Sequence, residues 1–222
     1  MTKHKLIIVG ASGHAKVIID VFEQIGNYKI LGLFDDRISK DTEVLGHKLL
    51  GKTAAISSFL TDNTNIEVFI AIGDNWTRSR VKKQLEQNNA NIHWANAIHP
   101  QAQIGKGTVF GKGVAILAGA VINSDARIGD FTIMGSNSIL DHDSHLGAYA
   151  SLAPGATVGG NVQIGNFSTV SLGANIIHGI KIGAHTVIGA GTTVLQNFGE
   201  NLVVFGSPAR EIRTREEGEK YL

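Results

Sequence analysis

A histidine between two carboxylates is the clearest reactive group in the sequence. His142 lies between Asp141 and Asp143 in the segment Leu-Asp-His-Asp-Ser at 140–144. The ordinary pKa of histidine, ~6.5, suits it to take a proton from a reacting group near neutral pH. A neighbouring carboxylate fixes the imidazole tautomer and stabilises the imidazolium ion. This segment is therefore a candidate for an oriented general base, and a surface histidine without a role is the alternative.

A glycine turn near the start of the chain is a second candidate site. The segment Gly-Ala-Ser-Gly-His-Ala at 10–15 lies between an expected strand at 5–10 and an expected helix at 15–24, a place where backbone N–H groups bind phosphate. Asp35 and Asp36 end the next strand, where carboxylates bind hydroxyl groups or a base edge. The spacing is not Gly-x-Gly-x-x-Gly, so we do not expect NAD binding. A tight turn without a ligand is the alternative.

The first hundred residues alternate between strand and helix patterns. Apolar runs predict strands at 5–10, 29–34 and 67–72, and a charged amphipathic helix is expected at 77–87. This alternation favours a parallel sheet with crossover helices. We therefore predict a small Rossmann-like α/β domain over residues 1–98.

A strict period of six residues begins at Ile104. Every sixth position is large and apolar: Ile104, Phe110, Ile116, Ile122, Ile128, Met134, Leu140, Leu146, Leu152, Val158, Ile164, Val170, Ile176, Ile182, Ile188 and Val194. The residues two places earlier are nearly all small or β-branched, and glycine often follows the large residue. Neither a helix nor an isolated strand keeps this phase. The period predicts a parallel β-helix over residues 99–222, with three hexapeptides in each triangular coil.

This repeat places the reactive histidine on the outside. The large residue and the residue two places before it point inward, so His142, two places after Leu140, points outward. Because one coil is 18 residues, a single row holds Ser124, His142, Gly160, His178 and Gln196. Gly160 leaves the backbone bare beside His142, with its N–H available to an oxyanion. His178 is either a cofactor contact or an exposed histidine, and we interpret His145 and His185 as structural.

Composition excludes several classes of function. The chain of 222 residues has a formal net charge of +1 and no cysteine. The balance of charge argues against a nucleic-acid surface, and the absence of thiols fits a reducing cytoplasm and excludes thiolate chemistry. The first apolar run is too short for a signal peptide or a membrane span. We expect a cytoplasmic protein with no membrane or nucleic-acid partner.

The order of the two domains, together with several short motifs, resembles a known family. These motifs are Gly-Ala-Ser-Gly-His at 10–14, Asp35-Asp36, Ala-Ile-Gly at 71–73, Asp-His-Asp at 141–143, Ser-Leu-Ala-Pro-Gly at 151–155 and Gly-Ser-Pro-Ala-Arg at 206–210. The chain resembles hexapeptide-repeat sugar acyltransferases, the family of bacterial nucleotide-amino-sugar N-acetyltransferases of the bacillosamine type and of sialic acid O-acetyltransferases. The resemblance implies a left-handed β-helix, usually trimeric, with acetyl-CoA along it as the acetyl donor.

The resemblance also assigns roles to residues. It implies direct acetylation, without an acyl-enzyme or a metal, of the amino group of a nucleotide-linked (UDP-type) 4-amino-4,6-dideoxy sugar for bacterial surface glycan biosynthesis. The family's catalytic histidine is followed by an acidic residue, as His142 is by Asp143. The resemblance therefore implies that His142 is the general base and Asp143 its orienting partner, with Asp141 the less favoured partner. The candidate acceptor-binding residues are Gly13, His14, Ala15, Asp35, Asp36 and Gly73. The candidate cofactor-binding residues are Ser151, Gly160, Leu172, His178 and Ala190. A homotrimer is expected, with each site between two subunits.

The sequence departs from the family pattern in two places. Gly135 stands where many relatives have asparagine, and Ser151 where the bacillosamine enzyme has a histidine that contacts the cofactor. O-acetylation of sialic acid or a related sugar is therefore the close alternative. Two alternatives come from other classes of protein. One is a metal-dependent hydratase, because related β-helices hold zinc with three histidines contributed across subunits, but the spacing of His142, His145 and His178 does not match those ligands. The other is a sugar-nucleotide-binding scaffold without activity.

Overall fold

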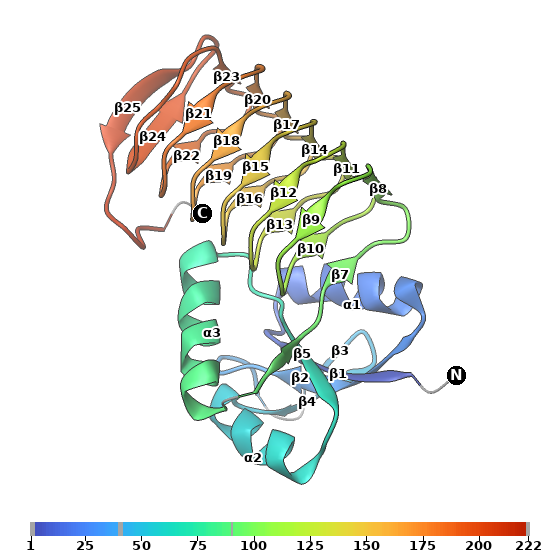
Figure 1. The fold of residues 1–222 in the computed structure, drawn as a ribbon. Coiled ribbons are helices and arrows are strands. Elements are labelled where there is room, and N and C mark those ends of the chain that lie inside the picture. The colour runs from blue at the N-terminus through green and yellow to red at the C-terminus, as the bar shows by residue number, and fades with distance from the viewer. Residues whose placement is uncertain (1–2, 40–41, 90, 221–222) are drawn as a thin grey trace. The chain divides into compact units, whose positions relative to one another are not determined.

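A computed structural model describes residues 3–39, 42–89 and 91–220. The chain divides into two compact units, Met1–Pro100 and Gln101–Leu222. The first is an α/β unit and the second a left-handed parallel β-helix (Figure 1). No helix in the described part of the chain is long and apolar enough to cross a membrane.

The first unit is built on a six-stranded sheet in the order β3-β4-β2-β1-β5-β6. The strands are β1 (His4–Val9), β2 (Tyr28–Phe34), β3 (Glu43–Val44), β4 (His47–Gly51), β5 (Ile66–Ile70) and β6 (His93–Trp94), and a further short strand, β7 (Ala97–Ile98), follows. The helices are α1 (Gly13–Ile25), η1 (Thr53–Ala55), α2 (Ile56–Asp62) and α3 (Asn75–Asn88). All pairings in this sheet are parallel except that of β3 with β4.

The central strand β1 explains the apolar run at the start of the chain. Residues 6–9 of β1 are fully buried between β2 and β5, with helices on both faces of the sheet. A strand covered on both faces is apolar throughout rather than alternating. The parallel sheet with crossover helices is confirmed, with β5 ending at Ile70 rather than at residue 72.

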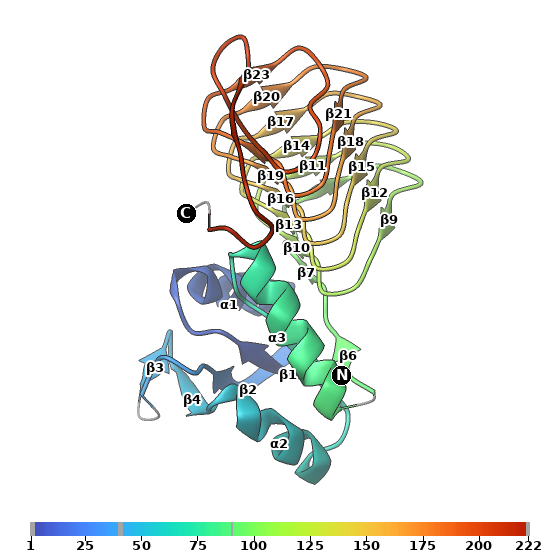
Figure 2. The same ribbon diagram turned by 90° about the vertical axis from the view of Figure 1, so that its left-hand side faces the viewer.

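The second unit stacks two-residue strands into three sheets (Figures 1 and 2). The first holds β8 (Gln103–Ile104), β11 (Val121–Ile122), β14 (Ile139–Leu140), β17 (Thr157–Val158), β20 (Asn175–Ile176) and β23 (Thr193–Val194). The second holds β9 (Val109–Phe110), β12 (Arg127–Ile128), β15 (His145–Leu146), β18 (Gln163–Ile164) and β21 (Lys181–Ile182). The third holds β10 (Ala115–Ile116), β13 (Ile133–Met134), β16 (Ser151–Leu152), β19 (Thr169–Val170), β22 (Val187–Ile188), β24 (Leu202–Phe205) and β25 (Arg210–Thr214).

The register between coils is 18 residues throughout the repeat, as in the pairing of Ile139 with Thr157. The large apolar residues from Ile116 to Val194 are buried, as are the residues two places before them, which confirms the predicted inward positions. Ile104, 43% exposed, and Phe110, partly exposed, are the exceptions, because β8 and β9 are the end strands of their sheets and have a coil on one side only.

The turns between strands follow the same period. The third residue after each large position, from Gly107 to Gly191, has a φ between 55° and 75°. The glycines directly after the large residues are needed for a different reason. A Cβ on Gly129 or Gly165 would lie 2.5 or 2.4 Å from the backbone nitrogen of Ala148 or Ala184 in the next coil. These glycines are small because the backbone of the next coil passes over them.

Candidate active site

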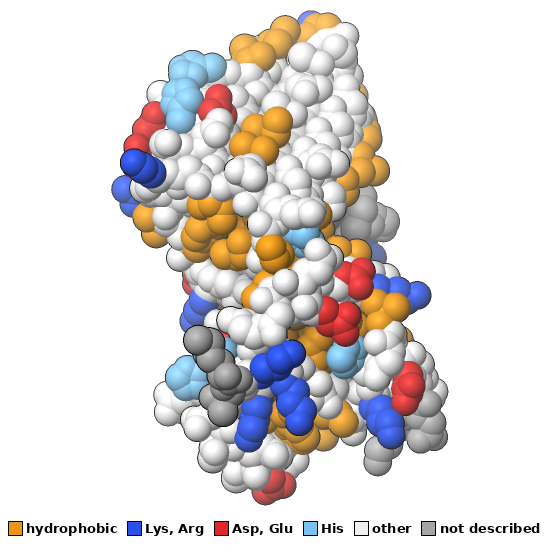
Figure 3. Space-filling view, turned by 90° about the vertical axis from the view of Figure 1, so that its right-hand side faces the viewer, with side chains coloured by type: hydrophobic (Ala, Val, Ile, Leu, Met, Phe, Trp, Pro, Cys, Tyr) orange, Lys and Arg blue, Asp and Glu red, His pale blue; other side chains and the backbone are white. Residues whose placement is uncertain are grey.

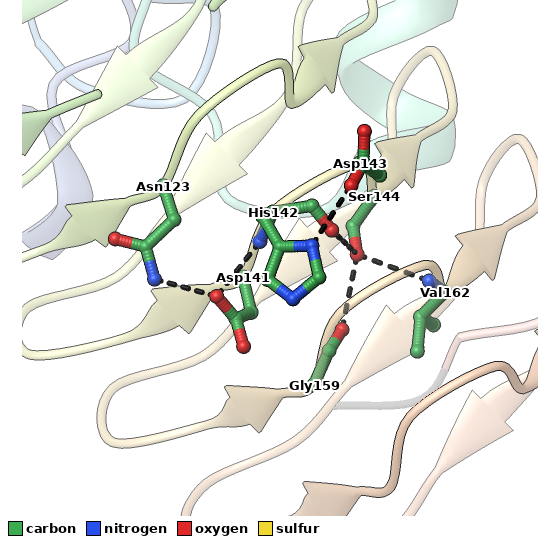
Figure 4. A network of polar contacts seen from close by, with 7 residues as sticks. All are labelled: Asn123, Asp141, His142, Asp143, Ser144, Gly159 and Val162. Carbon is green, nitrogen blue, oxygen red and sulfur yellow. Dashed lines mark hydrogen bonds and ion pairs between the residues drawn. The ribbon is translucent and has the colours of Figure 1, made fainter. Parts of the chain in front are cut away.

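His142 lies on the outer corner between β14 and β15, as the repeat predicted. The side chains of His142 and Asp143 are both solvent-accessible, and the imidazole Nδ1 lies 2.8 Å from the Asp143 Oδ2 (Figure 4). Asp143 occupies a turn position with φ 57°, a conformation that aspartate adopts more readily than most residues. The corner of the repeat therefore places the carboxylate beside the preceding side chain.

The electrostatics of this corner favour the protonated imidazole. The hydrogen bond that the imidazole donates to Asp143, and then the negative charge of Asp141, raise the pKa of His142 above its ordinary value. His142 nevertheless remains at the surface, with half of its side chain exposed. Its Nδ1 is occupied by the carboxylate, so Nε2 is the nitrogen that faces an incoming group.

A second carboxylate, Asp141, belongs to a network that the sequence did not predict. Its Oδ1 accepts hydrogen bonds from the Asn123 Nδ2 at 2.6 Å and from the His142 backbone N–H at 2.8 Å (Figure 4). These two bonds hold the pKa of Asp141 below its usual range, and the bond from Asn123 has the larger effect. Asn123 and Asp141 are 18 residues apart and so lie in one row of the β-helix, a signal that was available in the sequence.

Ser144 ties the corner of His142 to the next coil. Its hydroxyl donates to the carbonyl of Gly159 at 3.0 Å and accepts from the N–H of Val162 at 3.0 Å (Figure 4). The side chain is buried, so these bonds form away from water. They fix the spacing between the coil that carries His142 and the coil that carries Gly160.

Two of the predicted cofactor residues lie in the same row as His142. Gly160 is buried one coil away, against the imidazole of His142. His178 is exposed two coils away, yet the rings of His142 and His178 have centroids only 6.3 Å apart. The two rings approach because Gly160, between them, has no side chain.

The other three predicted cofactor residues lie elsewhere on the β-helix. Ser151 begins β16, where it is largely buried. Leu172 and Ala190 are exposed on the corner that follows the third sheet, whereas His142 lies on the corner that follows the first. A single chain therefore does not bring these three residues together with His142.

The glycine turn of the first unit leads into α1, and its histidine is held neutral. The Nε2 of His14 is buried and has no hydrogen-bond partner among the described residues. Burial, and then the positive charge of Arg78, lower the pKa of His14 to about 4. Arg78 is itself buried and donates from Nη1 to the carbonyls of Ile72 and Gly73, at 2.8 Å each. No pattern in the sequence indicated this buried cation.

The predicted acceptor-binding carboxylates hold loops of the first unit in place. Asp35 accepts from the N–H of Ala11 at 2.8 Å and thereby joins the glycine turn to the end of β2. Asp36 accepts from the N–H and the hydroxyl of Thr53, both at 2.9 Å. Ala15 is buried on α1, so only its backbone could face a ligand, whereas Gly13 and Gly73 border open space.

Among the residues that the structure describes, no group of three or more His, Cys, Asp or Glu side chains is arranged to hold a metal ion. His142 and His178 face each other, but their neighbouring carboxylates are engaged with Asn123 and His142. The chemistry that this corner offers is proton transfer by an oriented imidazole.

Both units of the chain are similar to parts of known proteins. Residues 5–85 match the family described as the PglD N-terminal domain. A single-residue variant of the GDP-perosamine N-acetyltransferase of Caulobacter crescentus, solved with CoA and GDP-perosamine, is 32% identical with a TM-score of 0.88. That similarity covers 93% of this chain and 96% of the other. The chain belongs to the hexapeptide-repeat sugar acyltransferase family.

Other members of this family show the same fold. The acetyltransferase domain of PglB from Neisseria gonorrhoeae, solved with acetyl coenzyme A, is 27% identical with a TM-score of 0.88, over 95% of this chain and all of that domain. The UDP-N-acetylbacillosamine N-acetyltransferase of Bacillus subtilis is 31% identical over 111 residues, half of each chain. The alignments with curated relatives cover half or less of those proteins' lengths.

Proposed function

We propose that this protein transfers the acetyl group of acetyl-CoA to the amino group of a nucleotide-linked 4-amino-4,6-dideoxy sugar, with His142 as the general base. The observation that carries the proposal is the 2.8 Å bond between the His142 Nδ1 and Asp143, on an exposed corner that leaves Nε2 accessible. The named function of the relatives supports N-acetylation over O-acetylation. We assign the product to bacterial surface glycan biosynthesis.

The hydrogen bond to Asp143 sets the tautomer that the reaction needs. With Nδ1–H donating to the carboxylate, the lone pair of neutral His142 is on Nε2. The acceptor amine attacks the thioester carbonyl carbon, and Nε2 takes the proton released from nitrogen. The C–S bond then breaks, and the imidazolium returns its proton to the departing thiolate. CoA leaves as the free thiol, and His142 is neutral again.

Gly160 is the candidate donor for the oxyanion of the tetrahedral intermediate. Its backbone N–H donates no hydrogen bond to any described residue, and it lies beside the imidazole of His142. An amide that is already oriented and not engaged stabilises developing charge without reorganisation. A CoA thioester lying along this row of the β-helix therefore has both a base and an oxyanion donor.

We assign the nucleotide of the acceptor to the first unit. The glycine turn leads into the N-terminus of α1, which has no acidic residue in its first turn. Helix N-termini attract phosphate, and the buried charge of Arg78 adds to the positive potential there. Because His14 is neutral, its buried Nε2 is available to a ligand hydroxyl or phosphate.

The test is a panel of GDP- and UDP-linked 4-amino-4,6-dideoxy sugars incubated with acetyl-CoA. Thiol release gives the rate, and the mass and hydroxylamine resistance of the product distinguish an amide from an ester. We expect an acetamido product with at least one acceptor and a large loss of rate in His142→Ala. An ester product, or thiol release that does not depend on the amine, would overturn the proposal.

A further inference from the structure

The imidazole of His142 occupies the space in which Gly160 would carry a side chain. A Cβ built on Gly160 would lie 2.6 Å from the His142 Nε2, 2.7 Å from its Cε1 and 3.1 Å from its Cδ2. These are the three nearest atoms, and all of them belong to the one ring. The two residues are 18 positions apart, so the contact joins adjacent coils.

Gly160 differs in this respect from most glycines of the repeat, and Gly189, against the ring of Phe205, is the other one without a left-handed φ whose nearest atoms all belong to one aromatic ring. A Cβ on Gly129, Gly147 or Gly165 would meet the backbone of the next coil. Gly160 lacks the left-handed φ of the turn positions, so its own backbone conformation does not call for glycine. The requirement for glycine at this position comes from the imidazole.

We infer that Gly160 is a positioning residue for the general base: its bare Cα is the surface on which the imidazole of His142 is seated. This inference rests on the proposed function for its catalytic meaning. The seat lets the Nε2 side of the ring lie against Gly160 while Nδ1 reaches the Asp143 carboxylate at 2.8 Å. It also explains how the rings of His142 and His178 come within 6.3 Å across an intervening coil.

A methyl group at position 160 should displace the ring without unfolding the chain. His142 is half exposed, so the ring can rotate toward solvent into another staggered rotamer while the coil keeps its geometry. Rotation separates Nδ1 from Asp143 and moves Nε2 from its place beside the Gly160 amide. The substitution retains the backbone N–H of residue 160, so it tests the seat and not the oxyanion donor.

The experiment compares Gly160→Ala with Gly199→Ala. Gly199 is in the same unit, also lacks a left-handed φ, and has no atom within 4 Å of a built Cβ, which makes it the matched control. For Gly160→Ala we expect kcat to fall about 10–100-fold, part of the ~10²–10⁴-fold that general base catalysis provides. The KM for acetyl-CoA should change less than about three-fold. Gly199→Ala should match the parent protein in both constants.

Two further measurements show whether the fall in kcat of Gly160→Ala is caused by displacement of the His142 ring. In a His142→Ala background, Gly160→Ala should cost no additional rate, because the group that it displaces is already absent. An NMR titration of the His142 ring, assigned by its loss in His142→Ala, should give a lower pKa in Gly160→Ala than in the parent protein, since the Asp143 bond is broken.

The outcomes separate the inference from the proposed function. An unchanged His142 titration in Gly160→Ala, or an equal rate loss with and without His142, overturns the positioning role even if sugars are acetylated. Absence of turnover with every amino sugar overturns the proposed function, while the titration, which needs no substrate, still decides whether Gly160 seats the ring.

Discussion

The Oδ2 of Asp143 lies 2.8 Å from the Nδ1 of His142, although the two residues are adjacent in the chain. Side chains of adjacent residues in an extended strand point to opposite faces. Here Asp143 has a φ of 57° at the corner, which turns its side chain back toward its neighbour. The partnership of base and acid is thus a product of the turn that ends each hexapeptide.

Asp143→Asn should shift the pH dependence of the reaction. The hydrogen bond from Asp143 is the largest of the effects that raise the pKa of His142, and the base acts in its neutral form. Loss of the negative charge lowers that pKa, so the acid limb of kcat/KM should move to lower pH. The plateau at high pH should fall about ten-fold, since a charge-assisted bond becomes an ordinary one. A profile of kcat/KM between about pH 5 and 9 measures both changes; an acid limb that moves upward contradicts the assignment.

His142→Ala should remove most turnover and leave the fold intact. General base catalysis contributes ~10²–10⁴-fold, so kcat should fall by that order while acetyl-CoA affinity changes little. The side chain is outward, and the aliphatic column does not touch it. His145→Ala, an exposed histidine on β15, is the control and should retain full activity. If kcat of His142→Ala stays within a few-fold of the parent, the base is another residue.

Asp141→Asn should lower the pKa of His142 by a smaller amount. The charge of Asp141 is the second of the effects that raise this pKa, and Asn123 can still donate to an asparagine oxygen at 141. The effect is through space between exposed groups, so ~1 M salt should reduce the difference between parent and variant. NMR titration of His142 in the parent protein and in Asp141→Asn, at low and at high salt, measures this difference in pKa. A difference that is insensitive to salt would indicate that Asp141 acts through geometry instead.

Gly129→Ala should destabilise the β-helix, whereas Gly199→Ala should not. A Cβ at 129 would lie 2.5 Å from the backbone nitrogen of Ala148, and one at 199 would meet nothing within 4 Å. Backbone cannot move aside as a side chain does, so we expect a loss of about 1–3 kcal/mol for Gly129→Ala. The change for Gly199→Ala should stay within about 0.5 kcal/mol. Urea unfolding followed by circular dichroism compares them, and equal midpoints would contradict the steric account.

We expect the protein to assemble as a homotrimer. Leu172, Ile177 and Leu195 are 57%, 45% and 51% exposed on the β-helix, and hydrophobic patches are visible on its outer surface in Figure 3. Rigid, exposed apolar side chains favour association. Light scattering should give three times the chain mass of 23.6 kDa. Leu172→Asp should weaken assembly, whereas Val17→Asp on α1 should not. A stable and fully active monomer would refute the expectation.

The sequence predicted the β-helix in detail because its period is strict. Each large apolar residue marks one strand, and burial of these residues from Ile116 onward follows from the stacking of identical positions. It predicted the first unit less completely. The hairpin β3–β4 and the helix α2 were not predicted. The strand β3 has two residues, β4 has only two adjacent apolar side chains, and α2 has seven residues, too few to show a helical period.

The candidate site was predicted only in part, for physical reasons. The pairing of His142 with Asp143 is local and follows from adjacency. The bond between Asn123 and Asp141 depends on which rotamers two side chains adopt, although their 18-residue spacing placed them in one row. The burial of Arg78 depends on carbonyl groups at the end of β5 that only the folded chain brings to it.

The constant 18-residue offset makes the β-helix modular. The contacts of the candidate site join residues that are neighbours in the chain or one coil apart, as Asn123 is to Asp141 and His142 to Gly160. Duplication or deletion of a whole coil outside residues 123–178 would leave each of these contacts unchanged. A single inserted residue between Asn123 and Asp141 would instead shift every later corner out of phase. The β-helix can therefore gain or lose whole coils of 18 residues during evolution, whereas within the site the spacing between rows must stay at 18 residues.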